Sequence, residues 1–569
     1  STDDLCDIQV GLTGTFALLM GYALGLSPLF NTETGMAGVG VCGLMDYGSN
    51  NGRGVIPAPP TAWTRIKQGW ATETIIRESG EFTIDSRDQD GKIYQIDISS
   101  NEYFLIEYRN NWIIENENDD IDSLRWKDDE GNYKKQIGHW FDSVLSELSE
   151  IQFDTLGGVF TKFENYDYGL PGSGLLIWHI REPQGDLLSG INNDRDNQAI
   201  QLEEADGAVD IGYSSAHPLF TQHVNGWKFD LWYADNFYYF EYGNPEESKL
   251  NDDKILTFDK DTRPNTDATD GARSGVRIEV LSKPSDEMTF SVNFGVDSDY
   301  EVELLSENDI TILGNGQIDG MGNIFYAFDD KIYQKNFTNE TEFSNLDSFN
   351  RVLCFDESCK FVLEDSQVAI TYLNQSGDST TSLEYFVIGY LTSLEENESL
   401  PIKASLGDID GDGLDELVFI SDNSIIVENY PNYTDVNGFP VQGDFHGQPL
   451  IADIIDVGDD HPEIICREGD HITILSHNGE RLKEIAAFSN QQIAIVPNWR
   501  DNKAALIDGT QLLLFDEFDI HDSYWLNEFS RSSNYPQSTG NHEAQSSFGF
   551  TNKLSAYNYP NPVRDEGTR

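Results

Sequence analysis

Apolar and polar residues alternate in short runs along much of this sequence, and turn residues separate the runs. A period of two is the pattern of a half-buried β-strand, because successive side chains point to opposite faces of a sheet. A short helix is predicted at 61–68, after a proline-rich break. With 569 residues the chain is too long for one hydrophobic core, so we expect a mainly β, multidomain protein. The clearest predicted strands are EFTIDSR at 81–87, KIYQIDIS at 92–99, YFLIEYR at 103–109, LLIWHI at 175–180 and MTFSVNF at 288–294.

A second pattern begins near residue 298, where strand–turn–strand units recur with a period of roughly 40–50 residues. This spacing is typical of the blades of a β-propeller, which must stack around an axis because one blade cannot bury its own faces. About five such units fit between 299 and 525. The clearest are LGDIDGDGLDELVFI at 406–420, PLIADIIDVGDDHPEIIC at 449–466 and AIVPNWRDNKAALIDGTQLLLF at 494–515.

The 406–420 unit carries alternating carboxylates that converge within one tight, glycine-containing turn. Oxygen-rich loops of this kind suit calcium. A strand follows the loop where an EF-hand would have a helix, so the loop instead resembles the calcium loops of FG-GAP repeats. We expect a structural calcium ion here. The expected ligands are Asp408, Asp410, Asp412, the Leu414 carbonyl and either Asp415 or Glu416.

Two weaker calcium candidates are present. The 449–466 unit keeps Asp453 and Asp456 but has an altered loop. The turn at 192–196 carries Asp194 and Asp196 shortly before LEEADG at 202–207. For this turn, a solvated surface loop is the alternative interpretation.

The stretch Ile8–Asn31 contains no charged residue and is long enough to cross a bilayer. A membrane segment is therefore one interpretation. Its flank carries Asp3, Asp4 and Asp7 rather than Lys or Arg, and glycines interrupt the run. These features favour a different interpretation, which depends on a family resemblance.

Several distinctive pieces follow one another between residues 15 and 296. They are GLMDYGSNNGRG at 43–54, PAPPTAWTRIKQGW at 57–70, FLIEYR at 104–109, LPGSGLLIWHI at 170–180, LEEADG at 202–207 and FDKDTRPNTDATDGARSGVRIEVLS at 258–282. In these pieces and in their order, residues from about 15 to 296 resemble the C-terminal part of the immune inhibitor A family of secreted metallopeptidases.

The resemblance implies a metzincin-like site that has lost its chemistry. The family's H-E-x-x-H motif falls on Leu18 and Tyr22 at the two His positions and on Leu19 at the Glu, and the third ligand falls on Pro28. Met45 occupies the Met-turn. Leu and Pro offer zinc no lone pair, and Leu cannot accept a proton, so neither zinc nor catalysis is expected.

Such a remnant lacks most of the chain that precedes the metal helix in the family, so it would expose apolar surface. We therefore expect a protein partner, such as a separate N-terminal chain, or self-assembly to cover the peptidase-like part.

The charge is strongly negative, with 36 Lys and Arg against 99 Asp and Glu and a net charge of −63. Such a surface repels nucleic acid and anionic membranes and attracts divalent cations. No nucleic-acid partner is expected. The alternative interpretation is that the acidity only keeps the protein soluble in salty surroundings.

Five cysteines are too few to organise a fold of this length. Cys354 and Cys359 have a spacing that suits a tight hairpin, and Cys6 could pair with Cys42. Cys466 would then remain unpaired and buried in a strand. This pattern is compatible with an extracellular protein.

Residues 528–550 are rich in Ser, Asn, Gln and Gly, which indicates a linker. The following YNYPNP at 557–562 resembles the opening strand of the Ig-like sorting domains of type IX-secreted proteins. This resemblance implies an extracellular protein or one on the outer-membrane surface of a bacterium. The expected domains are a metzincin-like remnant at 1–75, a β-rich, sandwich-like subdomain at 76–297, an FG-GAP-like propeller at 298–527, and a linker with one sorting-domain strand at 528–569.

Taken together, these features predict a non-catalytic secreted or surface protein that acts in binding, adhesion or extracellular assembly, with calcium and without a transmembrane span. Two alternatives stay open. One is an active secreted zinc endopeptidase. The other is a propeller that binds carbohydrate or another surface ligand.

Overall fold

The computed structural model divides into two compact units. The first comprises Ser1–Asp97, Asn101–Thr269 and Val276–Asn293, and the second comprises Ile98–Ser100, Asp270–Gly275 and Phe294–Arg569. Residues 12–75 belong to the first unit and do not form a unit of their own. The structure describes residues 12–54, 56–86, 92–111, 152–154, 159–162, 166–183, 185, 187–188, 190–213, 223–250, 253–295, 300–306, 308, 310–318, 321–329, 331–343, 351–355, 358–362, 368–373, 379–386, 404–429, 434–455, 461–501, 503–515, 525–527 and 530–531.

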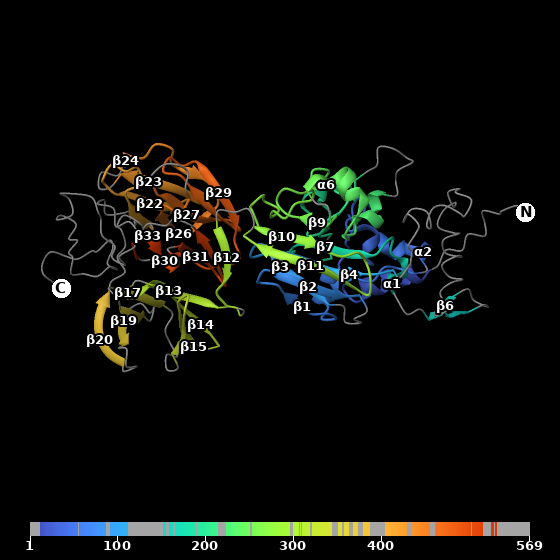
Figure 1. Ribbon diagram of the computed structural model, residues 1–569, viewed down its shortest axis with the longest axis horizontal. Helices are drawn as coiled ribbons and strands as arrows, with labels where there is room; N and C mark the ends of the chain where they lie inside the picture. Colours follow the sequence, from blue (N-terminus) through green and yellow to red (C-terminus); the bar gives the residue numbers. More distant parts are fainter. Residues whose placement is uncertain are drawn as a thin grey trace, which may run out of the picture. The chain divides into compact units, whose positions relative to one another are not determined.

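The first unit is built mainly from strands, with short helices between them (Figure 1). Its described helices are α1 Thr13–Ala23, η2 Gly40–Cys42, η3 Tyr47–Asn50, α2 Asn51–Gly54, α3 Ala62–Lys67, η4 Tyr166–Gly169, η5 Arg195–Asn197, η6 His223–Asn225, η7 Lys228–Asp230, η8 Tyr239–Gly243 and α6 Glu247–Leu250. Its described strands are β1 Glu73–Ile75, β2 Gly80–Asp85, β3 Ile93–Asp97, β4 Glu102–Arg109, β5 Gln152–Asp154, β6 Val159–Lys162, β7 Gly174–Arg181, β8 Ile200–Leu202, β9 Leu256–Phe258, β10 Val276–Val280 and β11 Glu287–Phe294.

Two sheets of this unit pack face to face. One has the order β1-β3-β4-β7-β8, and the other has the order β2-β11-β10-β9. Aromatic rings join them: the ring centroids of Phe104 on β4 and Phe258 on β9 lie 5.2 Å apart, and those of Tyr94 on β3 and Phe290 on β11 lie 5.5 Å apart. The predicted strands and the predicted helix at 61–68 are confirmed here, as β2, β3, β4, β7, β11 and α3. The β-rich subdomain is a sandwich.

A buried ion-pair network fastens the N-terminal segment to this sandwich. The carboxylate of Glu107 on β4 accepts hydrogen bonds from Arg65 on α3, from Arg109 Nε at 2.8 Å and from the Trp178 indole at 2.8 Å. Arg109 also donates to Asp167 and to the Pro60 carbonyl. Because the two guanidinium groups neutralise Glu107, its burial is tolerated, and α3 is held against β4.

The second unit consists of successive antiparallel hairpins (Figure 1). Its described strands are β12 Tyr300–Leu304, β13 Thr311–Ile318, β14 Met321–Phe328, β15 Lys331–Lys335, β16 Glu340–Phe343, β17 Arg351–Phe355, β18 Ser358–Val362, β19 Val368–Leu373, β20 Ser379–Phe386, β21 Ala404–Gly407, β22 Glu416–Ser421, β23 Ser424–Asn429, β24 Thr434–Asp435, β25 Val441–Gln442, β26 Phe445–Ala452, β27 Glu463–Glu468, β28 His471–Leu475, β29 Arg481–Ala486, β30 Ala494–Arg500, β31 Lys503–Asp508, β32 Gln511–Phe515, β33 Trp525–Asn527 and β34 Ser530–Arg531.

These strands form five sheets with a common plan, which is that of a β-propeller. The orders are β13-β14-β15-β16, β17-β18-β19-β20, β21-β22-β23-β24, β26-β27-β28-β29 and β30-β31-β32-β12. The last sheet joins the start of the unit to its end, because β12 pairs antiparallel with β32 along its whole length. This pairing covers an edge that would otherwise be open. The predicted mainly β architecture with a propeller is confirmed.

Neighbouring sheets share apolar cores. Leu417 and Val427 pack in one cluster with Ile451 and Ile464 of the next sheet. A second cluster joins the sheet that contains β26–β29 to the sheet formed by β30, β31, β32 and β12. A third cluster joins the sheet formed by β30, β31, β32 and β12 to the sheet that contains β13–β16. Strand β33 pairs with β26 on the edge away from β27. The cores therefore lie between the blades, as stacking predicts.

The surroundings of His179 on β7 make the stability of the first unit depend on pH. Its Nε2 lies 2.9 Å from Glu102 and its Nδ1 lies 3.1 Å from Glu203. Burial opposes protonation, but the two carboxylates outweigh it and raise the pKa of His179 to about 9. Its charged form therefore stabilises the folded state fully below the ordinary His pKa, and this stabilisation is lost as pH rises through the folded value.

We expect the first unit to lose on the order of 2–3 kcal/mol of stability between about pH 6.5 and pH 9. The variant His179→Gln should remove the contribution of His179 to that pH dependence, while the exposed His446→Gln should keep it. Chemical denaturation followed at a series of pH values checks this. A pH profile of His179→Gln identical to that of the unchanged protein would contradict it.

Candidate functional site

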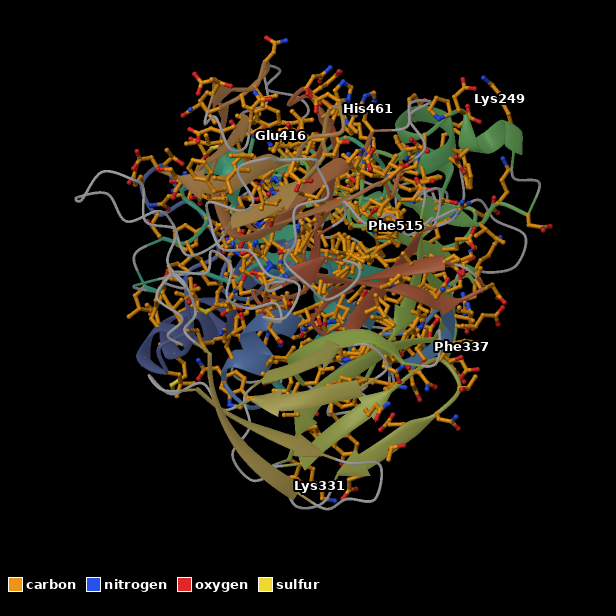
Figure 2. All side chains as sticks on the ribbon, turned by 90° about the vertical axis from the view of Figure 1, so that its left-hand side faces the viewer. Lys249, Lys331, Phe337, Glu416, His461 and Phe515 are labelled. Carbon is orange, nitrogen blue, oxygen red and sulfur yellow. The ribbon has the colours of Figure 1, made fainter. Side chains whose placement is uncertain are left out.

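The loop between β21 and β22 brings predicted calcium ligands together. Strand β21 ends at Gly407 and β22 begins at Glu416, so the loop is a short hairpin connection. Gly411 and Gly413 have φ values of 74° and 86°, a backbone region that glycine enters without strain. Carboxylate oxygens of Asp408, Asp410 and Glu416 all lie within 4.8 Å of one another. Figure 2 labels Glu416, which lies in the second unit.

Backbone hydrogen bonds orient these carboxylates. Glu416 Oε2 accepts the N–H of Ile409 at 2.8 Å, and Asp408 Oδ2 accepts the N–H of Gly413 at 3.0 Å. The other oxygen of each, Glu416 Oε1 and Asp408 Oδ1, is buried and accepts no hydrogen bond from the part of the chain that the structure describes. Two buried oxygens without donors, in one cluster, are what a cation would satisfy.

The electrostatics agree with this geometry. Burial raises the pKa of Glu416 to about 8 although its hydrogen bond from the Ile409 N–H lowers it, and the neighbouring carboxylates of Asp410, Asp408 and Asp412 also raise it. Burial also raises the pKa of Asp408. Glu416 rather than Asp415 is the residue that closes the group. Asp412 instead accepts the N–H of Leu414 at 2.7 Å.

The equivalent loop of the next blade repeats part of this arrangement. Glu463, the first residue of β27, accepts the N–H of Ile454 at 2.9 Å, just as Glu416 accepts that of Ile409. Asp453 stands where Asp408 stands, and Asp456 lies outside the described residues. Within the described residues, no third carboxylate joins Asp453 and Glu463 in a group that could hold a metal ion. Calcium at this loop stays a prediction.

The 192–196 turn does not gather a cation site among the described residues. Asp194 and Asp196 are exposed, Asp194 accepts the Asp196 N–H, and Asp196 accepts the Tyr213 hydroxyl. The preceding Asn192 and Asn193 instead bind the segment at 29–32, including the Leu29 carbonyl. These contacts fit the alternative interpretation, a polar surface turn, and calcium at Asp194 and Asp196 stays a prediction.

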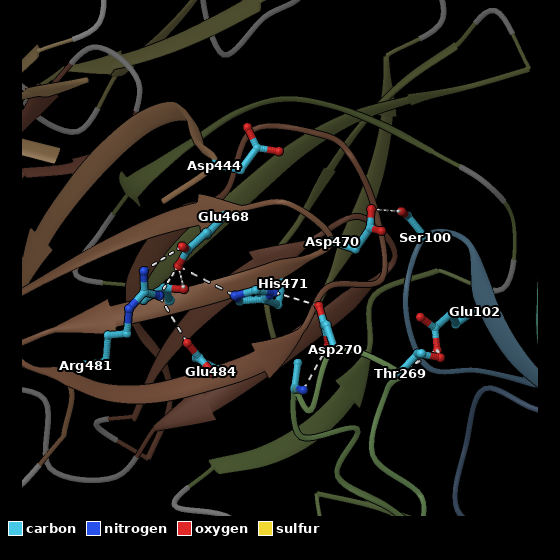
Figure 3. Close-up of polar contacts among 12 residues, drawn as sticks. Ser100, Glu102, Thr269, Asp270, Asp444, Glu468, Asp470, His471, Arg481 and Glu484 are labelled. Atoms are coloured by element: carbon cyan, nitrogen blue, oxygen red, sulfur yellow. Dashed lines mark hydrogen bonds and ion pairs between the residues drawn. The ribbon is translucent and has the colours of Figure 1, made fainter. Parts of the chain in front are cut away.

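A further acidic group in the second unit already has its counter-charge. Glu468, His471 and Glu484 lie close together, and Figure 3 shows Arg481 between the two glutamates. Arg481 Nη2 lies 2.6 Å from Glu468 Oε1, and its Nη1 lies 3.1 Å from Glu484. His471 in turn contacts Asp270 at 2.9 Å. Since Arg481 neutralises the carboxylates, this group has no need of a metal ion.

The positions that would hold zinc in a metzincin lie on and after α1. Leu18 and Tyr22 are one helical turn apart, Leu19 is exposed, and Pro28 is buried in the following segment. Met45 is fully buried, and its sulfur packs closely against Gly21 of α1. Asp46 beside it accepts the N–H groups of Gly38, Val39 and Gly40, which fixes the turn. None of the four positions offers imidazole or carboxylate to a metal.

Helix α1 places its large apolar side chains toward solvent. The exposed fraction is 66% for Phe16, 61% for Met20 and 57% for Leu19, and Leu12 and Leu24 continue the same stripe at helical spacing. The buried residues of the helix are Gly14 and Gly21. A Cβ at Gly14 would lie 1.8 Å from the Ser49 carbonyl oxygen, so the glycines let the helix approach its neighbours closely.

The cysteine predictions have different outcomes. Cys354 and Cys359 are directly paired across the β17–β18 hairpin, in the register that their spacing predicted. Their side chains lie outside the described residues, so the disulfide stays a prediction. Cys42 is a buried free thiol, as is Cys466. Cys42 is the last residue of η2 and is buried, and the other half of the expected Cys6–Cys42 bridge, Cys6, lies outside the described residues.

In the described part of the chain, no helix has both the length and the apolar character that a membrane crossing requires.

No protein-family model and no curated protein matches the chain. Among solved structures, it is similar to BBS1N in complex with ARL6DN, at 10% identity over 42% of this chain and 100% of that one, with a TM-score of 0.21. It is also similar to a virginiamycin B lyase from Staphylococcus aureus, at 14% identity over 40% of this chain and 82% of that one, with a TM-score of 0.14. A third similar structure is the Dos1 propeller, at 8% identity over 37% of this chain and 70% of that one, with a TM-score of 0.15. Scores this low carry no argument, so the propeller assignment rests on the order of strands in this chain. The resemblances to immune inhibitor A and to type IX sorting domains stay predictions.

The loop geometry predicts that calcium stabilises the second unit and that Glu416 is essential for this. We expect Glu416→Gln to weaken calcium binding at this loop at least tenfold and to abolish the rise in melting temperature that calcium causes there, because a ligand that binds only the folded state stabilises it by mass action.

The exposed Asp435→Asn serves as the matched control and should behave like the unchanged protein. Isothermal titration with calcium and thermal unfolding with and without a chelator measure both effects. An unchanged response of Glu416→Gln would show that the loop is not the binding site.

Proposed function

We propose that this protein is a non-catalytic, extracellular binding protein whose first unit docks onto another protein through α1. The observation that carries the proposal is the outward apolar stripe of α1, with Phe16, Leu19 and Met20 more than half exposed. Contiguous apolar side chains of this size mark interaction surfaces. The propeller, held at one blade by calcium, would present further surface for binding or assembly.

The charge distribution supports docking at this helix. The chain has a net charge of −63, but Ile8–Asn31 contains no charged residue. A partner can therefore approach α1 without burying a carboxylate, which would be costly. Docking elsewhere on so acidic a surface would require basic groups or bound cations from the partner.

The absence of catalysis is part of the proposal. Leu18, Leu19, Tyr22 and Pro28 occupy the ligand and base positions that the immune inhibitor A resemblance implies, and these side chains neither bind zinc nor take a proton from water. The buried Met45 beneath α1 supports the same interpretation, because the frame of the site persists without its chemistry. We propose calcium as the metal of this protein and expect no zinc.

An extracellular location, on the outer-membrane surface of a bacterium or released from it, is supported by the resemblance of the 557–562 segment to type IX sorting domains. That segment lies outside the described residues. The paired positions of Cys354 and Cys359 would also suit an oxidising environment.

The docking proposal predicts that substitutions on α1 dissociate the complex. We expect Phe16→Asp combined with Met20→Asp to weaken association by about 30-fold or more, because central apolar contacts dominate such interfaces. Sedimentation velocity of the natural assembly, compared with that of the double variant, measures this. The exposed Phe337→Asp in the second unit is the control and should not alter association (Figure 2).

A second measurement separates the outcomes. Met20 should be protected from mild oxidation in the natural assembly and should oxidise readily in the dissociated chain, since an exposed thioether is readily converted to the sulfoxide. A monomer in which Met20 oxidises freely would overturn the docking proposal. Stoichiometric zinc together with chelator-sensitive proteolysis would overturn the non-catalytic assignment and favour the endopeptidase.

A further inference from the structure

Three carboxylates meet in the interior of the first unit. Glu204 and Asp206 follow directly after β8, and Asp230 ends η7. Their exposed fractions are 1%, 6% and 1%. One oxygen of each lies within 4.8 Å of the others. Carboxylates are rarely buried this fully without a positive partner.

Among the described residues, the donors to this group are uncharged N–H groups. The Glu204 carboxylate accepts the backbone N–H groups of Asp210 at 2.8 Å and Ile211 at 3.0 Å. Asp206 accepts the Ala208 N–H at 2.9 Å and the Trp227 indole N–H at 2.8 Å. Asp230 Oδ2 accepts the Trp227 backbone N–H at 2.7 Å. None of the three carboxylates forms an ion pair with a described Lys, Arg or His.

One oxygen of the group is left without any donor. Asp230 Oδ1 is buried and accepts no hydrogen bond within the described residues. A buried carboxylate oxygen that lacks a partner costs free energy unless something else satisfies it. This orphaned oxygen is independent of the clustering, and it belongs to a side chain that is almost completely buried.

Several other buried carboxylates of this chain obtain positive charge from arginine, whereas Asp46 is held by backbone N–H groups alone. Glu107 is paired with Arg65 and Arg109, and Glu468 is paired with Arg481. Asp508, also fully buried, is paired with Arg467 at 2.6 Å. The group formed by Glu204, Asp206 and Asp230 has no such partner among the described residues. It contains three carboxylates, whereas the arginine-paired sites contain one or two. Burial raises the pKa of Glu204 to about 8 and raises that of Asp230 as well, and the neighbouring carboxylates act in the same direction.

We propose that Glu204, Asp206 and Asp230 bind a divalent cation with the chemistry of calcium, at a site separate from the propeller loop. Calcium takes carboxylate oxygens at about 2.3–2.6 Å, so two oxygens on one ion lie at most about 5 Å apart. The observed spacing within 4.8 Å meets that condition. Donors that are all oxygen favour a hard cation over zinc.

The cation links two segments that are distant in the sequence. It joins the turn after β8 to the segment at 227–230. The Ala205 N–H in that turn also donates a hydrogen bond of 3.0 Å to the Asp230 carbonyl. The Trp227 indole, held by Asp206, packs edge-on against Phe229 and Tyr238 at centroid distances of 4.8 and 4.6 Å. A cation here therefore fixes this aromatic cluster as well as the carboxylates.

Trp227 makes the site measurable. Terbium occupies calcium sites, and its emission is sensitised by a tryptophan close to the ion. The test uses the full chain with Glu416→Gln, so that the propeller loop no longer contributes. We expect strong tryptophan-sensitised terbium emission from this chain, which excess calcium displaces. Emission no greater than that of free terbium would overturn the proposal.

Substitutions then assign the residues. Asp230→Asn in the Glu416→Gln chain should reduce the emission and the calcium affinity at least tenfold, and Glu204→Gln should do the same if Asp230→Asn fails to fold. The exposed Asp196→Asn, a short distance away in the sequence, is the matched control and should change neither. Circular dichroism checks folding.

Calcium titration of the otherwise unchanged chain separates this site from the propeller site. Loss of one bound ion in Asp230→Asn and of a different one in Glu416→Gln supports two independent sites. Full calcium binding by Asp230→Asn and Glu204→Gln, together with greater stability in chelator, would mean that the three carboxyl groups share protons rather than a cation. That result would overturn this proposal and leave the propeller loop and the docking helix untouched.

Discussion

A buried carboxylate needs hydrogen-bond donors or a compensating positive charge, and this requirement shapes both units of the protein. Where arginine is available, as for Glu107 and Glu468, the ion pair fastens neighbouring elements together. Where it is not, clusters remain at Glu416 and at Asp230 in which one oxygen of each of these residues accepts no hydrogen bond from the described residues. The chain has 99 acidic and 36 basic residues, and the divalent cations that we propose would supply positive charge where no described basic residue does.

The propeller combines buried carboxylates with a repeated arrangement of strands. Consecutive hairpins form sheets that cannot cover their own faces, and the cores lie between them. The pairing of β12 with β32 joins the last sheet to the start of the unit. A glutamate at the start of the second strand accepts a loop N–H in two successive blades, at Glu416 and Glu463. This shared hydrogen bond shapes the loop, and among the described residues the loop at Glu416 adds a cluster with unsatisfied oxygens.

Local patterns made much of this predictable from the sequence. Period-two alternation located β2, β3, β4, β7 and β11, and the spacing of the acidic loop predicted the group at Asp408 and Glu416. The rest depends on long-range packing. Asp230 joins Glu204 only through the fold, so attention to nearby acids selected Asp194 and Asp196 instead. The outward apolar face of α1 also reverses the usual expectation, because two glycines rather than its leucines face the interior.

Both proposed metal sites depend on one claim, that cations rather than protons compensate the clustered carboxylates. Anomalous diffraction from crystals grown at neutral pH with calcium tests it most directly. The account predicts an anomalous peak within about 2.6 Å of Glu416 Oε1 and another at the same distance from Asp230 Oδ1. Crystals without a peak at either position, with the carboxyl groups hydrogen-bonded to one another, would contradict it.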